Sequence, residues 1–337
     1  MSLPSIADFL RQNKLDFARR ASEKYFDRHP DYKLWKSGIE HTLEDTAYTL
    51  DFLASSIELQ TTDAFTGYIR WLRTVLDTRH LDVGMILESL ADIREVLKDF
   101  PEALSAATPY LDAAVSGLGR ESASDVDMDG SSSAYLQAVL RADRRAAMTV
   151  VDECLRTNEP ASVYAEVIAA AMHEIGRLWQ ANRISVAREH TATATTQYVL
   201  AQVYSQHSPS STKRGKAVVS GMQGEFHQLG AHMAADVLDF DGWDVRFLGT
   251  NMPHDGILAA IDEHEAAVVG LSATMLTSSS KLAALINDIK RKMPSARILV
   301  GGSLVVNHYI DAASMGADGG ALSLLQGRET VRSWSAC

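Results

Sequence analysis

Residues 217–230 read AVVSGMQGEFHQLG, an apolar run that passes directly into a loop bounded by glycines. The run at 217–222 is typical of a β-strand that is buried on both faces. Gly224 and Gly230 bracket the loop, and His227 lies inside it. In parallel sheets, ligands bind at the carboxyl ends of the strands. We therefore expect His227 at the ligand-binding edge of a parallel sheet.

Three further short apolar runs follow, at 243–248, 267–272 and 297–300, and helix-like segments separate them. Alternation of buried strands and helices is typical of a doubly wound parallel sheet. The sequence therefore predicts a Rossmann-like domain over 214–325, followed by a short tail at 326–337.

The chain before this domain is expected to be helical. Apolar residues recur at spacings of three and four through 1–118, which predicts an all-helical module. The polar, Ser-rich stretch 119–133 is expected to be a linker. Residues 134–207 predict a four-helix unit, in which one long helix follows Pro160 and another is capped by Ser185. Pro101 and Pro109 are expected near helix starts. The fold class is therefore α plus α/β.

Composition excludes several classes of protein. Of the 337 residues, 46% are hydrophobic and 22% are charged, as in soluble globular proteins. The net charge of −11 disfavours binding to nucleic acid through the phosphate backbone. Cys154 and Cys337 lie far apart, which suits a reducing cytosol. The N-terminal residues do not read as a signal peptide, and no apolar run reaches the length of a membrane span. We expect a cytoplasmic protein without a membrane partner.

The loop at 224–230 has the chemistry of a metal site. An exposed imidazole at His227 is able to bind a metal ion, and Glu225 is placed to accept its other ring N–H. Gly230 would let a ligand approach the backbone closely. The ordinary alternative is a loop histidine that caps the next helix.

Two other strand ends share this edge. Ser272 and Thr274 follow the third strand, and Gly301 and Gly302 follow the fourth. Small side chains there leave a slot between the strand ends. Together with the His227 loop, these elements resemble the cobalamin-binding domain family. The resemblance implies that His227 is the lower axial ligand of cobalt and that the slot holds the dimethylbenzimidazole tail. Glu225 stands where the family motif has Asp.

A second resemblance lies in the helical unit. Trp179 is followed, after nine residues, by Glu189 and His190. This spacing before a cobalamin domain resembles the adenosylcobalamin photoreceptors, which include light-dependent repressors of carotenoid synthesis. The resemblance implies that Trp179 packs on the adenosyl group, with the other two residues beside it. It implies a cobalamin site made of Trp179, Glu189, His190, Glu225, Phe226, His227, Gly230, Ser272, Thr274, Gly301 and Gly302.

One position departs from the repressor pattern. The repressors have a cobalt-binding His directly after the Trp, and this chain has Gln180, which is a poor cobalt ligand. We hypothesise that His190 or His173 takes the upper position after illumination. A photoproduct with water in that position is the alternative.

The N-terminal module does not read as the winged-helix DNA reader of the repressors. The run at 64–90 resembles globin-like sensor modules, and this order of domains is similar to that of the photocobilins, which use adenosylcobalamin and biliverdin. The resemblance implies a bilin site, for which the candidates in the module are His41, Tyr48, Tyr68, Arg70, Trp71, Arg79 and His80. Haem is a rival ligand, with His41 or His80 as its axial residue. Cys154 lies outside the module, so covalent attachment of a bilin there is not expected.

These resemblances imply a light-sensing regulatory protein rather than an enzyme. The expected output is light-dependent self-association into a dimer or tetramer, or binding to a separate effector protein. A corrinoid methyl carrier of a methyltransferase system is the main alternative. A mutase subunit and a plain nucleotide-binding domain are further alternatives.

Overall fold

The computed structural model describes residues 2–31, 36–118, 128–207 and 214–334. The chain divides into two compact units, residues 1–123 and 124–337. In the described part of the chain, no helix combines the length and the apolar character that crossing a membrane requires.

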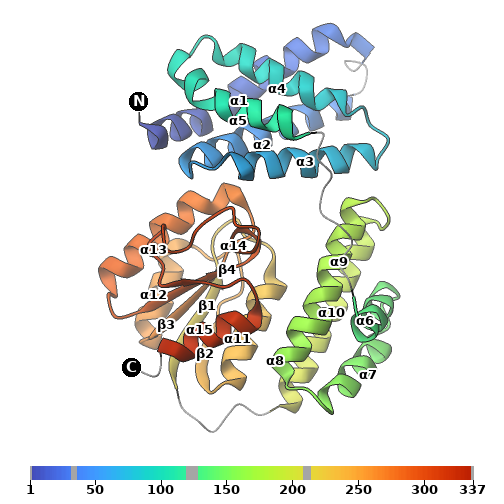
Figure 1. Ribbon diagram of the computed structural model, residues 1–337, viewed down its shortest axis with the longest axis vertical. Coiled ribbons are helices and arrows are strands. Elements are labelled where there is room, and N and C mark those ends of the chain that lie inside the picture. Colours follow the sequence, from blue (N-terminus) through green and yellow to red (C-terminus); the bar gives the residue numbers. More distant parts are fainter. Residues whose placement is uncertain (1, 32–35, 119–127, 208–213, 335–337) are drawn as a thin grey trace. The chain divides into compact units, whose positions relative to one another are not determined.

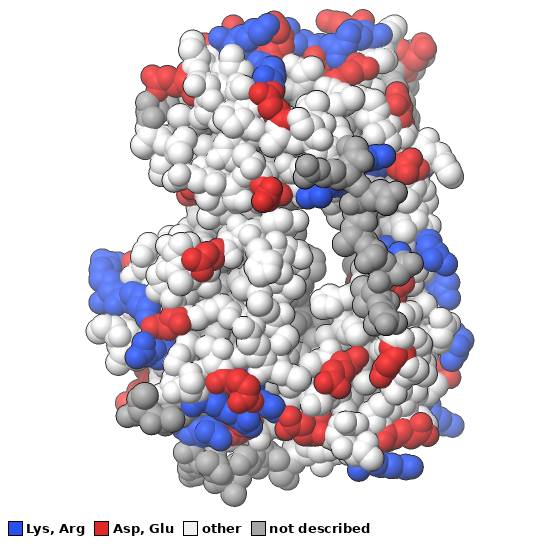
Figure 2. Space-filling model, viewed as in Figure 1, with Lys and Arg blue, Asp and Glu red and all other residues white. Residues whose placement is uncertain are grey.

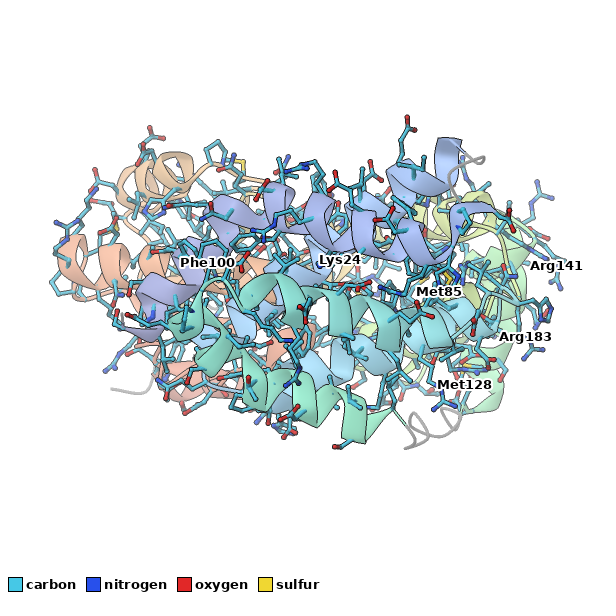
Figure 3. The ribbon with its side chains drawn as sticks, turned by 90° about the horizontal axis from the view of Figure 1, so that it is seen from above. Lys24, Met85, Phe100, Met128, Arg141 and Arg183 are labelled. Atoms are coloured by element: carbon cyan, nitrogen blue, oxygen red, sulfur yellow. The ribbon has the colours of Figure 1, made fainter. Side chains whose placement is uncertain are left out.

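The first unit consists of helices, as its apolar spacing predicts. They are α1 (Leu3–Arg28), α2 (Lys36–Glu58), α3 (Thr62–Asp77), α4 (Gly84–Leu97) and α5 (Pro101–Gly117). α1 packs on α2 and α4, and α3 packs on α5. Phe100, labelled in Figure 3, contacts Phe9 and Phe17 with ring centroids 5.3 and 5.1 Å away. An apolar core therefore holds the five helices together.

The two prolines of α5 have different positions. Pro101 is the first residue of the helix, where the missing N–H costs nothing. Pro109 lies inside the helix, so its expected position near a helix start is wrong. The helix continues past Pro109 because its buried face, which includes Ala107, Tyr110 and Leu111, packs into the core.

The second unit begins with the cap, a name used here for residues 130–206. Its helices are α6 (Gly130–Leu140), α7 (Arg144–Leu155), α8 (Pro160–Val163), the π-helix η2 (Tyr164–Ile168), α9 (Ala169–Gln180) and α10 (Val186–Gln206). α8, η2 and α9 follow one another without a break, so the cap has the four helices expected. Ser185 caps α10 through its side chain, as predicted. α6 starts inside the expected linker, of which residues 119–127 lie outside the described part.

The sheet domain follows the cap. Its strands are β1 (Gly215–Gly221), β2 (Trp243–Phe247), β3 (Val268–Ser272), β4 (Arg297–Gly301) and β5 (Gly319–Gly320), in the order β2-β1-β3-β4-β5. All pairs are parallel, which confirms the Rossmann-like expectation. Four strands lie where the sequence predicts them. β5 was not predicted, because two glycines carry no apolar run.

Helices cover both faces of this sheet. They are α11 (Gln228–Phe240), α12 (His254–His264), α13 (Ser279–Lys292), the short α14 (Ser303–Val306) and α15 (Leu324–Trp334), with a 3-10 turn, η3 (Leu276–Ser278), before α13. α11 and α15 pack side by side, and Figure 1 shows α12 and α13 on the opposite face.

The prediction of a tail at 326–337 is wrong, because residues up to 334 belong to α15. Val331 is fully buried, and Arg332 donates two hydrogen bonds to the buried Asp241 at the end of α11. These contacts fix a helix whose sequence has few apolar residues. Residues 335–337 lie outside the described part.

Candidate functional site

The site is built at the carboxyl ends of three adjacent strands. In the register of the sheet, Ser272 at the end of β3 lies between Gly221 of β1 and Gly301 of β4. The two neighbours of Ser272 carry no side chain, and Thr250 and Glu225 pack over Gly221, where a Cβ would lie 2.7 and 3.1 Å from their side chains. Ligands of such sheets bind at the point where the order of the strands reverses. In this sheet that point lies between β1 and β3.

His227 is held in place by a buried carboxylate. Oε1 of Glu225 accepts hydrogen bonds from the backbone N–H of His227 at 2.9 Å and from its ring Nδ1 at 2.6 Å. Oε2 of Glu225 accepts from the backbone N–H and the hydroxyl of Thr274, at 2.7 and 2.5 Å. The carboxylate therefore ties the loop after β1 to the loop after β3. It fixes the His227 ring in one orientation.

These hydrogen bonds decide the charge of Glu225. Its side chain is fully buried, and burial alone would raise its pKa. The hydrogen bonds from His227 and Thr274 outweigh burial and lower the pKa to about 2. The hydrogen bond to Glu225 in turn raises the pKa of His227 above its ordinary value. An ionised acceptor on Nδ1 makes the other ring nitrogen, Nε2, a better metal ligand.

Nε2 of His227 is open to a ligand. The His227 side chain is 63% exposed, and Nε2 has no hydrogen-bond partner among the residues that the structure describes. His227 is the N-cap residue of α11, but its side chain makes no capping hydrogen bond. The capping alternative from the sequence analysis therefore does not describe this histidine. Phe226 beside it is 72% exposed.

Two glycines shape the slot in different ways. A Cβ on Gly302 would lie 2.4 Å from the carbonyl oxygen of Ala273, and Gly302 has a positive φ of 96°. Only glycine fits there. A Cβ on Gly230 would meet nothing within 4 Å, so the first turn of α11 faces open space. The open space beside Gly230 and the exposed ring of His227 therefore fit a ligand that meets an imidazole at this edge of the sheet.

The cap presents a second group of side chains. Glu189 accepts hydrogen bonds from Nδ1 of His190 at 2.6 Å and from the hydroxyl of Thr193 at 2.9 Å. The negative charge of Glu189 is the smallest of the effects that raise the pKa of His227, after the hydrogen bond and the charge of Glu225. Trp179 packs partly buried against the core of the cap. Thr193 was not singled out from the sequence, although its position four residues after Glu189 on a helix is a usable signal.

The two candidates for an upper cobalt ligand have different positions. His190 is 76% exposed and lies beside Glu189. His173 lies six residues before Trp179 in α9, so it is about 9 Å along the helix and roughly 120° round it. His173 and Trp179 therefore do not share a helix face. Burial lowers the pKa of His173.

The candidate bilin residues are dispersed over the first unit. Tyr68 is buried, accepts or donates a hydrogen bond with Thr49 at 3.1 Å and stacks with Trp71 at 6.1 Å. Tyr48 lines a separate groove of about 520 Å³ between α1 and α2. The remaining four are an exposed histidine on α2, two partly exposed arginines and a histidine in the turn after α3, namely His41, Arg70, Arg79 and His80.

A smaller cavity of about 70 Å³ lies among α1, α2, α3 and α4, and none of the seven candidates lines it. Its lining includes Thr42, Thr46 and Thr49 from α2 and Met85 from α4, which is labelled in Figure 3. Three hydroxyl groups at helical spacing on α2 therefore line this cavity, and none of them is a predicted site residue.

Comparisons with known proteins agree on the second unit. Residues 215–326 match a B12 binding domain family, and residues 132–204 match a second B12 binding domain family. Dimethylamine corrinoid protein 1 of Methanosarcina mazei is 23% identical over 186 residues, 54% of this chain and 85% of that protein. The HTH-type transcriptional repressor CarH of Myxococcus xanthus is 24% identical over 231 residues, 67% of this chain and 76% of that protein.

One solved structure supports the same fold. The Methanosarcina barkeri monomethylamine corrinoid protein aligns with a TM-score of 0.51 and 16% identity, covering 58% of this chain and 94% of that one. At this identity the likeness shows the fold alone. The two matched segments coincide with the cap and the sheet domain described above.

Proposed function

The chain is a cobalamin-binding protein, and we propose that it is a light sensor that holds adenosylcobalamin between the cap and the sheet domain. The observation that carries this proposal is the buried Glu225, which orients the exposed His227 ring, together with the hydrogen-bonded group of Glu189, His190 and Thr193 at the start of α10. A group on the upper side of the ligand would meet polar and aromatic side chains of the cap.

The lower side would be held by the sheet domain. His227 would bind cobalt through Nε2, while Glu225 and Thr274 keep its ring in place. Ser272, Gly301 and Gly302 would line the slot for the nucleotide tail, and Phe226 and Gly230 would border its entrance. Bound adenosylcobalamin supplies a cobalt–carbon bond that visible light breaks.

The upper side would be held by the cap. Trp179, Glu189 and His190 would bind the adenosyl group, and without that group the cap loses one of its contacts toward the sheet domain. A ligand that binds only one of two arrangements shifts their populations. A shift from 1:99 to 99:1 requires about 5.5 kcal/mol of differential binding.

We propose that the output is a change of assembly, to or from a dimer or tetramer, or the binding of a separate effector protein. Direct reading of DNA is not proposed. On the face that Figure 2 draws, lysines and arginines are interspersed with acidic residues, and the net charge is −11. We propose that the chain is a regulatory protein of the cytoplasm that has no catalytic turnover.

We further propose biliverdin as a second chromophore in the first unit. Its support is the resemblance of the module to that of the photocobilins and the stacked pair Tyr68 and Trp71. Arg70 and Arg79 are the cations proposed for its propionates, and Tyr48, His41 and His80 are the other candidate contacts.

A corrinoid methyl carrier is the second candidate function. The similarity to the dimethylamine corrinoid proteins favours it, since they match about as well as the repressor does. A carrier needs an open upper face for its partner enzyme. The residues around Glu189 favour the sensor, because they would occupy that face.

One experiment separates these functions. The full-length protein is loaded with adenosylcobalamin and biliverdin, and its absorption spectrum is taken in the dark and after green light. A light-dependent cobalamin change supports the sensor, and a bound far-red band supports the second chromophore. Preference for methylcobalamin without a change in assembly would favour the carrier. His227→Ala is the control for specific binding.

A further inference from the structure

The interface between the cap and the sheet domain is an apolar stripe on α11. Met233 and Val237 are buried in the core of the cap, and Leu229 and Phe240 pack against that core. The positions 229, 233, 237 and 240 recur at helical spacing, so they share one face of α11. Apolar contacts are not directional, so this stripe by itself tolerates a shift of one helix along the other.

One buried hydrogen bond interrupts this stripe. The hydroxyl of Tyr164 donates to Oδ2 of Asp236 at 3.0 Å and lies 3.4 Å from the carbonyl oxygen of Leu200. Tyr164 is fully buried and Asp236 is 6% exposed. A hydrogen bond of fixed length and direction inside an apolar interface selects one register.

Two further polar contacts join the cap and the sheet domain nearer the surface of the described residues. The exposed Tyr204 hydroxyl donates to Asp239, and the mostly buried Arg328 donates to the exposed Glu159. Exposed pairs contribute little to a fixed geometry. The Tyr164–Asp236 bond is therefore the contact best suited to fix the position of the cap.

Tyr164 also starts an irregular turn. The π-helix at Tyr164–Ile168 interrupts the otherwise α-helical path from Pro160 to Gln180. Relative to a regular α-helix, one extra residue rotates everything that follows by about 100° and advances it by about 1.5 Å. The direction of Trp179 therefore depends on this turn.

Two helical segments connect this hydrogen bond to the proposed site. Along α11, Asp236 lies nine residues after His227, or about 14 Å at a helical rise of 1.5 Å per residue. Along the cap helix, Trp179 lies fifteen residues after Tyr164, or about 22 Å at the same rise. The position of His227 relative to Trp179 thus depends on the contact between Tyr164 and Asp236.

We propose that Tyr164 and Asp236 are positioning residues, whose hydrogen bond sets the register between the cap and α11 and so the spacing of Trp179 over His227. This inference rests on the proposed cobalamin site for its consequence, but not for its test. The two residues do not contact the ligand in this proposal.

The test measures the position of the cap without any ligand. Spin labels are placed at the exposed Ala194 of α10 and Asn307 after α14, in a full-length background with Cys154→Ser and Cys337→Ser. Pulsed dipolar spectroscopy then gives the distribution of distances between them. The variants are Tyr164→Phe with Asp236→Leu, Tyr164→Phe alone, and Asp236→Asn as the conservative control, which keeps an acceptor for the tyrosine hydroxyl.

We expect a narrow distribution for the parent protein and for Asp236→Asn. The double variant keeps apolar packing, so it should still fold cooperatively, but its distribution should broaden or shift. Its dissociation constant for adenosylcobalamin should rise on the order of tenfold, because fewer molecules have the binding arrangement. If the double variant does not fold, Tyr164→Phe compared with Asp236→Asn gives the same contrast.

An unchanged distribution in the folded double variant, or in Tyr164→Phe, would overturn the proposal. Equal broadening in Asp236→Asn and Tyr164→Phe would also overturn it, since the lost hydrogen bond would not be the cause. If the parent protein takes up no cobalamin, the proposed function fails, while the distances still decide the role of Tyr164 and Asp236.

Discussion

Oε1 of Glu225 accepts hydrogen bonds from both the backbone N–H and the ring Nδ1 of His227. One oxygen thus fixes the loop and the imidazole at the same time, while the other oxygen holds Thr274. A fully buried carboxylate thus orients one exposed ring. Such an arrangement is expected where the free ring nitrogen has to bind a metal.

The first prediction concerns this carboxylate. Glu225→Gln should weaken cobalamin binding by about 10–100-fold, because the amide is a poorer acceptor and leaves the ring less basic. Titration of the protein with cobalamin, followed by absorbance, measures the loss. Glu265→Gln is the matched control, since Glu265 is 80% exposed and pairs with Lys216 at the far end of β1. Equal affinity in both variants would contradict the role of Glu225.

The second prediction compares two glycines of the slot. Gly302→Ala should destabilise the fold by about 1–3 kcal/mol, because its φ is positive and the new Cβ would strike the Ala273 carbonyl oxygen. Gly230→Ala should raise stability by up to about 1 kcal/mol, since it lies in the first turn of α11 with open space around it. Urea unfolding at equilibrium measures both.

The Gly230→Ala variant also separates the stability of the fold from the affinity for cobalamin. Gly230→Ala places a methyl group in the proposed entrance, so cobalamin affinity should fall although stability does not. A Gly230→Ala variant that binds cobalamin as the parent does would show that the slot does not extend to α11.

The third prediction separates the two upper-face histidines. In protein loaded with adenosylcobalamin and illuminated, His190→Ala should change the spectrum of the photoproduct, because His190 is 76% exposed and belongs with Glu189 to the proposed upper side of the site. His173→Ala should leave that spectrum unchanged, since His173 does not share a helix face with Trp179. The reverse result would assign His173 as the upper ligand.

Much of the sheet domain could be predicted from the sequence. Four strands are short apolar runs, and His227 and Glu225 stand two residues apart in one loop, so their hydrogen bond needs no tertiary information. The hydrogen bond between Glu225 and Thr274 is different. It joins residues 49 positions apart and requires β1 and β3 to be neighbours.

Other features leave no trace in local pattern. The π turn at Tyr164 adds one residue to a helix whose apolar positions still fit a regular period. Asp236 reads as a residue on a solvent-facing side, and only the packing of the cap buries it. α15 was expected to be a tail because its apolar content is low. Its stability comes from Arg332 and the buried Asp241, which are 91 positions apart.

The last prediction concerns the pH dependence of stability. Burial raises the pKa of Asp236 to about 7, which the hydrogen bond from Tyr164 only partly opposes and the charge of Asp239 reinforces. Between its ordinary pKa of 3.8 and about 7, the folded protein keeps a proton that the unfolded chain has released. Raising the pH through this window therefore favours unfolding, and above it the effect is constant.

His232, on the same helix, works in the opposite direction. Burial lowers its pKa, so the unfolded chain binds a proton that the folded protein does not, and stability rises with pH toward the ordinary pKa of 6.5. The measurement must therefore be a difference. The free energy of unfolding of Asp236→Asn minus that of the parent, from urea titrations at pH 4.5 to 7.5, should grow by a few kcal/mol, on the order of 1.4 per pKa unit. A difference that stays constant would show that Asp236 is not buried against the cap as a protonated acid.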